Sequence, residues 1–313
     1  MFAFILKRMA AALPVMAVVA AVVFAILRLT PGDPAAILAG DSATPEQLDA
    51  IRKNLGLDEP IYMQFLHWIG QLLQGDFGTS LLSGTPVVEM IGQRMGPSIA
   101  LCISTIIVAI VVAIPLGVLA AWRQGKLLDR MVMAASVLGF SIPVFVTGYV
   151  LILAFSLGLG WFPVQGYKPL EEGVLPFLRS ITLPTLALST VYIALIARIT
   201  RTSVIEVMNE DFIRTARAKG LGERSVLLGH ALRNAAVPIV TIIGVGVAML
   251  IGGVVVTESV FNLPGLGRLV VEAVLARDYP VIQGLILLFA LVYVLINLVV
   301  DVSYTVFDPR IRY

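Results

Sequence analysis

The sequence predicts an all-α membrane protein with six transmembrane helices, and its composition is the first reason. Of its 313 residues, 58% are hydrophobic and 13% are charged, and the mean hydropathy is +0.95. Soluble domains are about 45–50% apolar and about 25% charged, so this chain is too apolar for a water-soluble globule. A disordered chain needs the opposite composition. A disulfide scaffold is excluded because Cys102 is the only cysteine.

Six stretches without Asp, Glu, Lys, Arg or His are the second reason. Helices rise 1.5 Å per residue, so about 20 apolar residues cross the ~30 Å hydrocarbon layer. The stretches are 9–27, 99–121, 131–158, 181–197, 235–257 and 281–300. The fourth has only 17 residues, and we expect its flanks to add a turn. The first exceeds a usual signal-peptide core and is followed by no small-residue cleavage site, so we interpret it as a retained helix.

The distribution of positive charge predicts the orientation. Connections 1–8, 122–130, 198–234 and 301–313 together carry 14 Lys and Arg over 67 residues, whereas 28–98, 159–180 and 258–280 carry 8 over 116. Cytoplasmic loops are enriched in Lys and Arg. Both termini and the 198–234 loop are therefore predicted to be cytoplasmic.

The first outer connection, 28–98, carries two amphipathic helical patterns. Thr44 and Gln47 form a capping-box pattern at the start of the first. The second is expected to start near Pro60 and to end before Gly75. Two interpretations remain open: the helices pack on the outer ends of the spans, or they help to form a docking surface for an external partner.

The 198–234 loop is the most informative connection. We expect Asn209 to cap a helix of about ten residues with Glu210 and Asp211 in its first turn, and Gly220 to end it. A second helical pattern, 223–234, leads into the fifth span. The short helix is either an interfacial element lying on lipid head groups or a rigid element that a soluble partner grips to move the spans.

Several kinds of chemistry are missing from the sequence. The six stretches offer no ionisable residue, which a proton-coupled transporter normally needs inside the bilayer. His67 and His230 are predicted to lie on opposite faces, so no haem pair or histidine-based metal site is expected. Gly125-Lys126 lacks the upstream glycine and is followed by Leu127, so no phosphate-binding loop for ATP is present. We therefore expect no cofactor in this chain, and energy for active transport must come from another subunit.

Small and polar residues recur at helical spacing in two of the spans. A stripe four residues apart either packs helices closely or lines a path. It consists of Gly244, Ala248 and Gly252. A polar line at the cytoplasmic end of the last span is either an interfacial anchor or part of a substrate path. It consists of Asn297, Asp301, Tyr304 and Asp308.

The 198–234 loop resembles the characteristic cytoplasmic loop of the membrane-spanning subunits of ATP-binding-cassette (ABC) importers, particularly the dipeptide/oligopeptide/nickel class. The string RTARAKGLGERSVLLGHALRN, from Arg214 to Asn234, carries the resemblance. The wider pattern is Glu-Ala-Ala, three residues, Gly, then Ile-x-Leu-Pro. Here Arg214-Thr215-Ala216 stand for the first three residues, Gly220 and Leu232 match, His230 replaces Ile and Arg233 replaces Pro.

Further segments resemble the same class along nearly the whole chain. They are LTPGDPA (29–35), LGLDEP (55–60), GDFGTS (75–80), PGLGRL (264–269), RDYPVIQG (277–284) and NLVVDVSYTVFDPRIRY (297–313). The resemblance implies a type I ABC importer permease fold in the inner membrane. The expected organisation is 1–27 as the N-terminal end and first span, 28–98 as the periplasmic connection, and 99–313 as the core permease domain with the coupling loop 198–234.

The resemblance also implies the partners. They are a homologous second permease subunit, two cytoplasmic ATP-binding subunits that hold ATP and Mg, a periplasmic or lipid-anchored substrate-binding protein, and the lipid bilayer; no nucleic acid is expected. The residues expected to contact the ATPase are Arg214, Thr215, Ala216, Arg217, Ala218, Lys219, Gly220, Leu221 and Gly222. Residues expected to pack helices or line the path are Gly244, Ala248, Gly252, Asn297 and Asp301.

The predicted function is ATP-driven, binding-protein-dependent import of dipeptides or oligopeptides, and the chain itself is not predicted to be an enzyme. Glutathione and nickel remain alternative substrates, because close relatives in the class carry them. A secondary transporter or channel working alone would show uptake without an ATPase. A membrane enzyme would need a buried acid, base or metal cluster. A purely structural adaptor is the remaining alternative.

Overall fold

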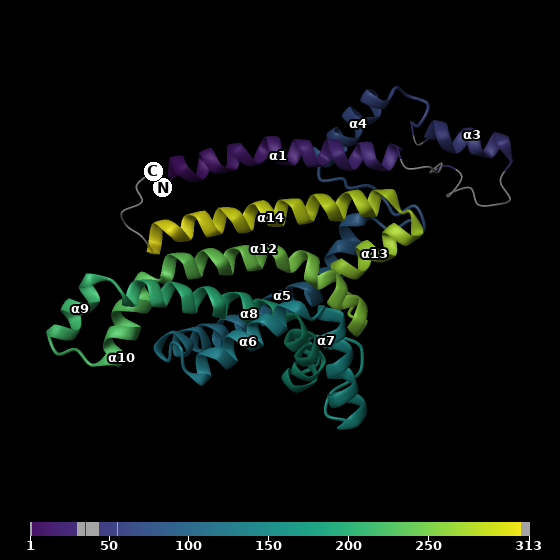
Figure 1. Ribbon diagram of the computed structural model, residues 1–313. Helices are drawn as coiled ribbons and strands as arrows, with labels where there is room; N and C mark the ends of the chain where they lie inside the picture. Colours follow the sequence, from purple (N-terminus) through teal and green to yellow (C-terminus); the bar gives the residue numbers. More distant parts are fainter. Residues whose placement is uncertain (1, 30–34, 36–43, 55, 308–313) are drawn as a thin grey trace. The chain divides into compact units, whose positions relative to one another are not determined.

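The computed structural model describes residues 2–29, 35, 44–54 and 56–307, and this part of the chain is built from helices (Figure 1). The helices of the N-terminal third are α1 (Phe2–Leu29), α3 (Pro45–Asn54), α4 (Ile61–Leu73) and α5 (Val87–Trp122). Those of the middle are α6 (Leu127–Ser141), α7 (Val144–Leu151), the π-helical turn η1 (Ile152–Gly158), the 3-10 turn η2 (Leu170–Glu172) and α8 (Val174–Met208). The remainder are α9 (Asp211–Ala218), α10 (Glu223–Ser225), the π-helical turn η3 (Val226–Ala231), α11 (Leu232–Asn234), α12 (Ala236–Phe261), α13 (Leu266–Ala276) and α14 (Tyr279–Phe307).

Five single helices in the described residues are long and apolar enough to cross a membrane. They are Leu6–Ile26 of α1, Val87–Trp122, Val174–Met208, Ala236–Phe261 and Tyr279–Ser303 of α14. Each contains one of the predicted stretches or nearly all of it. The short fourth stretch becomes part of the 35-residue helix α8, because helical residues continue on both sides of it.

The third predicted span is not one continuous helix. It is divided into α6 and the pair α7–η1, which are bent by 102° relative to each other. The break lies at Ile142, whose backbone is extended (φ −84°, ψ 123°) and which precedes Pro143. A proline disfavours the helical conformation in the residue before it and donates no backbone hydrogen bond. The chain has six spans only if this bent pair is one of them.

Helix α12 extends beyond its charge-free stretch and buries an acidic side chain. Glu258 was placed by the sequence in an outer connection, but it lies on the last turn of α12 with no exposed surface. The Ser98 hydroxyl donates a hydrogen bond to its carboxylate, and the Leu266 N–H donates to the Ser98 oxygen at 2.8 Å. A carboxylate is therefore buried among the helices, although the six stretches themselves contain no Asp, Glu, Lys, Arg or His.

The described residues form two compact units. Unit 1 comprises Gly96–Gly267 and the C-terminal part from Leu295, and unit 2 comprises Phe2–Met95 and Arg268–Val294. In unit 1, α8 packs against α12, α6 and α7 around a core of buried side chains. The largest fully buried members of this core are Leu101, Leu183, Leu188, Leu250 and Leu263.

Unit 2 joins the first span to the outer helix α4. The Phe24 ring of α1 lies 5.3 Å from the Phe65 ring and 5.6 Å from the Trp68 ring, both on α4. In the same unit the buried carboxylate of Asp278 accepts hydrogen bonds from the Ser80 hydroxyl and the Leu81 N–H. Helix α4 thus packs on a span, as one of the two interpretations of the outer helices expects.

The small-residue stripe of α12 has two different environments. A Cβ placed on Gly244 would overlap a methyl group of Val300 on α14, which leaves no room for a side chain. Gly252 is exposed, and no atom lies within 4 Å of a Cβ placed there. Within unit 1, close approach of two helices therefore depends on Gly244 and not on Gly252.

We predict that Gly244→Leu lowers the thermal unfolding midpoint of the detergent-solubilised protein, because overpacking costs about 1–3 kcal/mol. Gly252→Leu is the matched control on the same helix. It should leave the midpoint unchanged or raise it, because leucine favours helix over glycine by roughly 1 kcal/mol. Equal midpoints for the two variants would show that α12 and α14 do not approach each other at Gly244.

Candidate functional site

The short helix of the 198–234 loop, α9, begins differently from the sequence-based prediction. Its N-cap is Glu210, whose backbone is extended and whose side chain makes no capping hydrogen bond. Asn209 does not cap α9, so that prediction is wrong. It ends α8 instead, where its N–H donates to the carbonyl of Glu206. Because α8 continues to Met208, only Asn209 and Glu210 remain for the turn, and α9 has 8 residues.

The end of α9 is closed by a glycine, as the sequence predicts. Gly220 has φ +81°, in the left-handed region that disfavours side chains. Its N–H donates to the Arg217 carbonyl at 2.9 Å, and the Leu221 N–H donates to the Ala216 carbonyl at 3.3 Å. These two bonds form a Schellman motif, which satisfies the last carbonyl groups of a helix.

One face of α9 is buried in unit 1. Ile213 has no exposed surface and Ala216 is buried, three residues further on. Both belong to a cluster of apolar side chains from α5, α8, η3 and α12. Its other fully or largely buried members are Val118, Ala121, Val204, Val226, Leu227, Ala231, Ala235 and Ile239. The inner face of α9 therefore packs against η3 and forms part of an apolar cluster to which α5, α8 and α12 also contribute.

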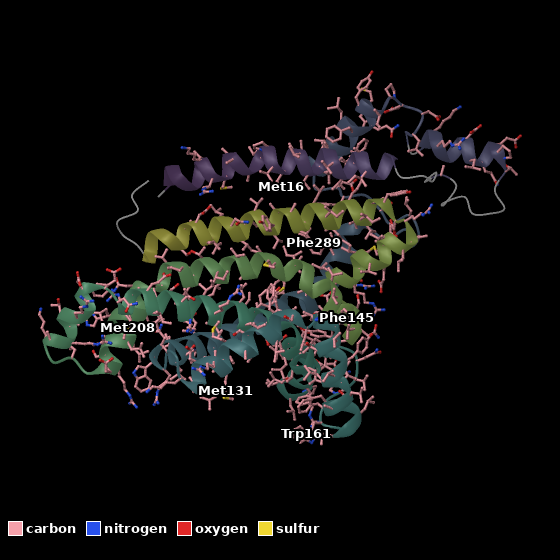
Figure 2. The ribbon with its side chains drawn as sticks, viewed as in Figure 1. Met16, Met131, Phe145, Trp161, Met208 and Phe289 are labelled. Atoms are coloured by element: carbon pink, nitrogen blue, oxygen red, sulfur yellow. The ribbon has the colours of Figure 1, made fainter. Side chains whose placement is uncertain are left out.

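The remaining surface of α9 and the turn after it faces outward, and we call it the docking face. Its members are Phe212, Arg214, Thr215, Ala218, Lys219 and Leu221, all exposed. Phe212 is 42% exposed and Leu221 is 40% exposed, which is unusual for large apolar side chains in a polar loop. Figure 1 shows α9 and α10 at one end of unit 1, and Figure 2 labels Met208, the last residue of α8, beside them. The face combines two apolar side chains with cations.

Arg217 is engaged within the chain. Its guanidinium donates to both carboxylate oxygens of Glu223, at 2.8 and 3.3 Å. Both side chains are partly exposed, so the pair contributes little stability, on the order of 0–1 kcal/mol. The pair joins the end of α9 to the start of α10 across Gly220 and Gly222. Arg217 therefore shapes the loop, whereas Lys219 forms no ion pair within the described part of the chain.

The expected second helix of the loop is present but contains a π-helical turn. Residues 223–234 run through α10, η3 and α11 without leaving the helical conformation. The π-helical turn, Val226–Ala231, buries Val226, Leu227 and Ala231 toward α9 and its neighbours. Such turns are rare and often occur at functional sites.

A buried ion pair near the start of α6 was missed by the sequence analysis. Asp129 is almost fully buried and accepts two hydrogen bonds from the Arg201 guanidinium on α8 and one from the Gly125 N–H. The two residues are 72 positions apart, so no local spacing could have indicated the pair. It holds the 122–126 turn against α8, about two helical turns before the end of that helix. Removing one partner of a buried pair costs about 3–5 kcal/mol.

The other predicted site residues do not join α9. Gly244 and Gly252 lie on α12, with Ala248 partly buried between them, and Asn297 and Asp301 lie four residues apart on α14. Asn297 and Asp301 each have an interaction partner. Asp308 lies outside the described residues, as does the side chain of Tyr304. No group of three or more His, Cys, Asp and Glu side chains suited to a metal ion occurs among the described residues.

Comparisons with known proteins agree with this architecture along the whole chain. Residues 113–313 match the family described as the inner membrane component of binding-protein-dependent transport systems, and residues 1–102 match the family described as the N-terminal part of such membrane components. A probable peptide ABC transporter permease of Sinorhizobium fredii is 51% identical over 310 residues, which are 99% of each chain. The glutathione transport system permease of Salmonella typhimurium is 44% identical over 313 residues, which are 100% of each chain.

A solved structure shares the fold. A chain of the inward-facing MetNI methionine ABC transporter is similar with a TM-score of 0.60 and 18% identity, over 71% of this chain and 97% of that one. The long full-length matches decide the family, and the shared fold agrees with them. The chain belongs to the inner membrane permease subunits of binding-protein-dependent ABC importers.

Proposed function

We propose that α9 is the element through which ATP hydrolysis on partner subunits drives this permease. The single observation that carries the proposal is the two-sided character of α9: its inner face lies in an apolar cluster shared with α5, α8, η3 and α12, while its docking face exposes Phe212 and Leu221. A partner bound to this face would push on a helix that is closed at its C-terminal end and packed on its inner face. Its displacement would be passed to α5, α8 and α12, because interiors packed at high density transmit strain.

The proposed residues for this contact extend from Arg214 to Gly222. The structure supports different roles for different residues of this segment. Arg214, Thr215, Ala218, Lys219 and Leu221 are exposed for contact, together with Phe212, which the sequence analysis did not select. Ala216 packs inward, and Arg217 and Gly220 hold the shape of the loop.

The proposed assembly contains a homologous second permease subunit, two cytoplasmic ATP-binding subunits and a periplasmic or lipid-anchored substrate-binding protein. ATP and Mg belong to the ATP-binding subunits, and this chain contributes no catalytic residue. The excess of Lys and Arg in alternate connections supports cytoplasmic termini and a cytoplasmic α9. The many exposed large apolar side chains on α5, α7 and α14 require a cover, which lipid and the second permease would provide.

The proposed cargo is a dipeptide or oligopeptide, carried by alternating access. Relatives named for peptide transport and for glutathione transport, which is itself the transport of a small peptide, support this class. Glutathione is therefore the nearest alternative cargo, and nickel a more distant one.

Replacing the exposed apolar side chains should weaken ATPase docking. We expect Phe212→Ala and Leu221→Ala each to lower the affinity for the ATP-binding subunits by about tenfold, since well-placed interface side chains contribute more than about 1 kcal/mol. The affinity can be measured by titrating purified ATP-binding subunits onto the permease in nanodiscs. Leu127→Ala is the matched control, because Leu127 is 73% exposed but lies outside the docking face. Unchanged binding by both docking-face variants would contradict the proposal.

Changing the glycine that ends α9 should uncouple transport from ATP hydrolysis. Gly220→Ala forces a side chain into the left-handed conformation at a cost of about 1–2 kcal/mol, and a β-branched residue should be worse. Gly92→Ala is the control, because Gly92 lies on α5 outside the proposed contact, has no positive φ and has open space around it. We expect reduced substrate uptake per ATP hydrolysed for the first variant, with normal membrane insertion, and wild-type coupling for the second. Wild-type uptake by Gly220→Ala and Gly220→Val would show that the shape of this helix end is unimportant.

The cargo can be tested with the complete importer in proteoliposomes. Dipeptides or oligopeptides should stimulate ATP hydrolysis and accumulate inside in an ATP-dependent manner, and glutathione and nickel should be compared at equal concentration. Stimulation by nickel alone would overturn the peptide assignment but leave the role of α9 intact. Accumulation by the permease alone, driven by an ion gradient, would instead refute the dependence on ATP-binding subunits.

A further inference from the structure

A pocket of about 540 Å³ lies in unit 1 between the loop after η1 and the first turns of α8. Trp161, Tyr167, Lys168 and Arg179 are among its lining residues, and no acidic side chain lines it. Figure 2 labels Trp161 at the tip of the segment that follows α7, and Met208 at the other end of the same unit beside α9. The pocket is therefore separate from the docking face and unused by the proposed coupling mechanism.

Backbone and side-chain hydrogen bonds hold the walls of the pocket in place. The Gly166 N–H donates to the carbonyl of Phe261, at the end of α12, over 3.0 Å. The Lys168 N–H donates to the hydroxyl of Ser180 on α8 at 3.2 Å. The loop is thus tied to two helices, so the pocket is formed before any ligand enters, which lowers the entropic cost of binding.

The two cations of the pocket differ in their partners among the described residues. The Lys168 ammonium already donates to the Glu172 carboxylate at 2.8 Å, and both side chains are about half exposed. The Arg179 guanidinium forms no ion pair or hydrogen bond with any residue that the structure describes, although it lines the pocket. Burial and the nearby Glu171 raise the pKa of Tyr167 above its ordinary value. The pocket therefore offers the positive charge of Arg179 beside the Tyr167 phenol and the Lys168–Glu172 ion pair.

The rim of the pocket is apolar. Trp161 is 57% exposed and Leu175 is 63% exposed, and both line the pocket. Tryptophan is enriched where a membrane meets water, and arginine extends its charged head toward that boundary from an apolar stem. The pocket lies where apolar helices give way to a polar loop, and such a boundary favours lipid head groups.

We propose that this pocket binds the head group of a membrane phospholipid, with the Arg179 guanidinium on the phosphodiester and the acyl chains along the apolar rim. Guanidinium groups bind phosphate oxygens through paired, charge-assisted hydrogen bonds. An acidic side chain of a soluble partner would satisfy Arg179 but would leave the apolar rim uncovered, whereas a lipid satisfies both. Because Lys168 already pairs with Glu172, one phosphate is enough to pair with the remaining cation, Arg179. Phosphatidylethanolamine and phosphatidylglycerol each carry one phosphate, so they should bind with similar affinity.

The test uses Trp161 as the reporter in the full-length chain purified in detergent. Replacing Trp68 and Trp122 by Phe leaves Trp161 as the only tryptophan. Titration with dihexanoyl phosphatidylethanolamine or phosphatidylglycerol should shift its emission with saturation, and dihexanoylglycerol, which lacks the phosphate, should not. Arg179→Gln should weaken the apparent affinity by about tenfold or more, as expected for hydrogen bonds to a charged group.

Arg198→Gln in the same background is the matched control, because Arg198 is an exposed arginine on α8 outside the pocket. It should bind the lipids like the parent. An equal response to dihexanoylglycerol, or an unchanged affinity in Arg179→Gln, would overturn the phosphate assignment. Saturation by inorganic phosphate at the same concentration would make the pocket a free-anion site and overturn the lipid assignment, as would tighter binding of an acidic peptide than of either phospholipid.

Discussion

The packing of α8 against its neighbours is the interaction on which the rest of unit 1 depends. Among the candidate spans α8 is the most buried, with 67% of its apolar window buried against 28% for α12. It contacts α6, α7 and α12, and it leads directly into the turn before α9. Within a bilayer every backbone polar group must find a partner inside the protein, so such a helix has no alternative conformation. Helices α8 and α9 are two separate helices joined by a turn of only two residues, Asn209 and Glu210.

Much of this fold could be predicted from the sequence, because a charge-free stretch long enough to cross the hydrocarbon layer indicates a transmembrane helix directly. Gly220 could also be predicted, since the end of a helix and its conformational requirement are local. The break at Pro143 also depends on local sequence. It is not predicted, because the charge-free stretch 131–158 is long enough for one continuous span. The burial of Glu258 and its contact with Ser98 could not be predicted, because the residues are 160 positions apart and only the fold brings them together.

The candidate site likewise combines features that could be predicted from the sequence with features that could not. The position of α9 and its C-terminal end are predicted correctly from the sequence, but its N-cap is predicted one residue too early, because Asn209 suits both the end of one helix and the start of the next. It also treated Arg217 as a contact for a partner, and the bidentate pair with Glu223 shows an intramolecular role. The exposure of Phe212 could not be predicted, because it depends on which face of α9 is buried, and the fold buries Ile213 and Ala216.

Two contacts of unit 1 that involve a buried carboxylate lie toward the ends of its long helices, while the core between them is largely apolar and contains the neutral hydrogen bond between the Ser104 and Thr185 hydroxyls of α5 and α8. Asp129 and Arg201 join α6 and α8 near the end that carries α9, and Ser98 contacts Glu258 at the far end of α12. Because α8 and α12 are connected through the 198–234 loop and pack against each other, these two contacts mark opposite ends of one helical hairpin. Apolar contacts between helices are non-directional and tolerate small sliding, whereas charge-assisted hydrogen bonds fix a register. Reorientation of the spans is therefore expected to occur as movement of whole helices about their fixed ends, without local unfolding.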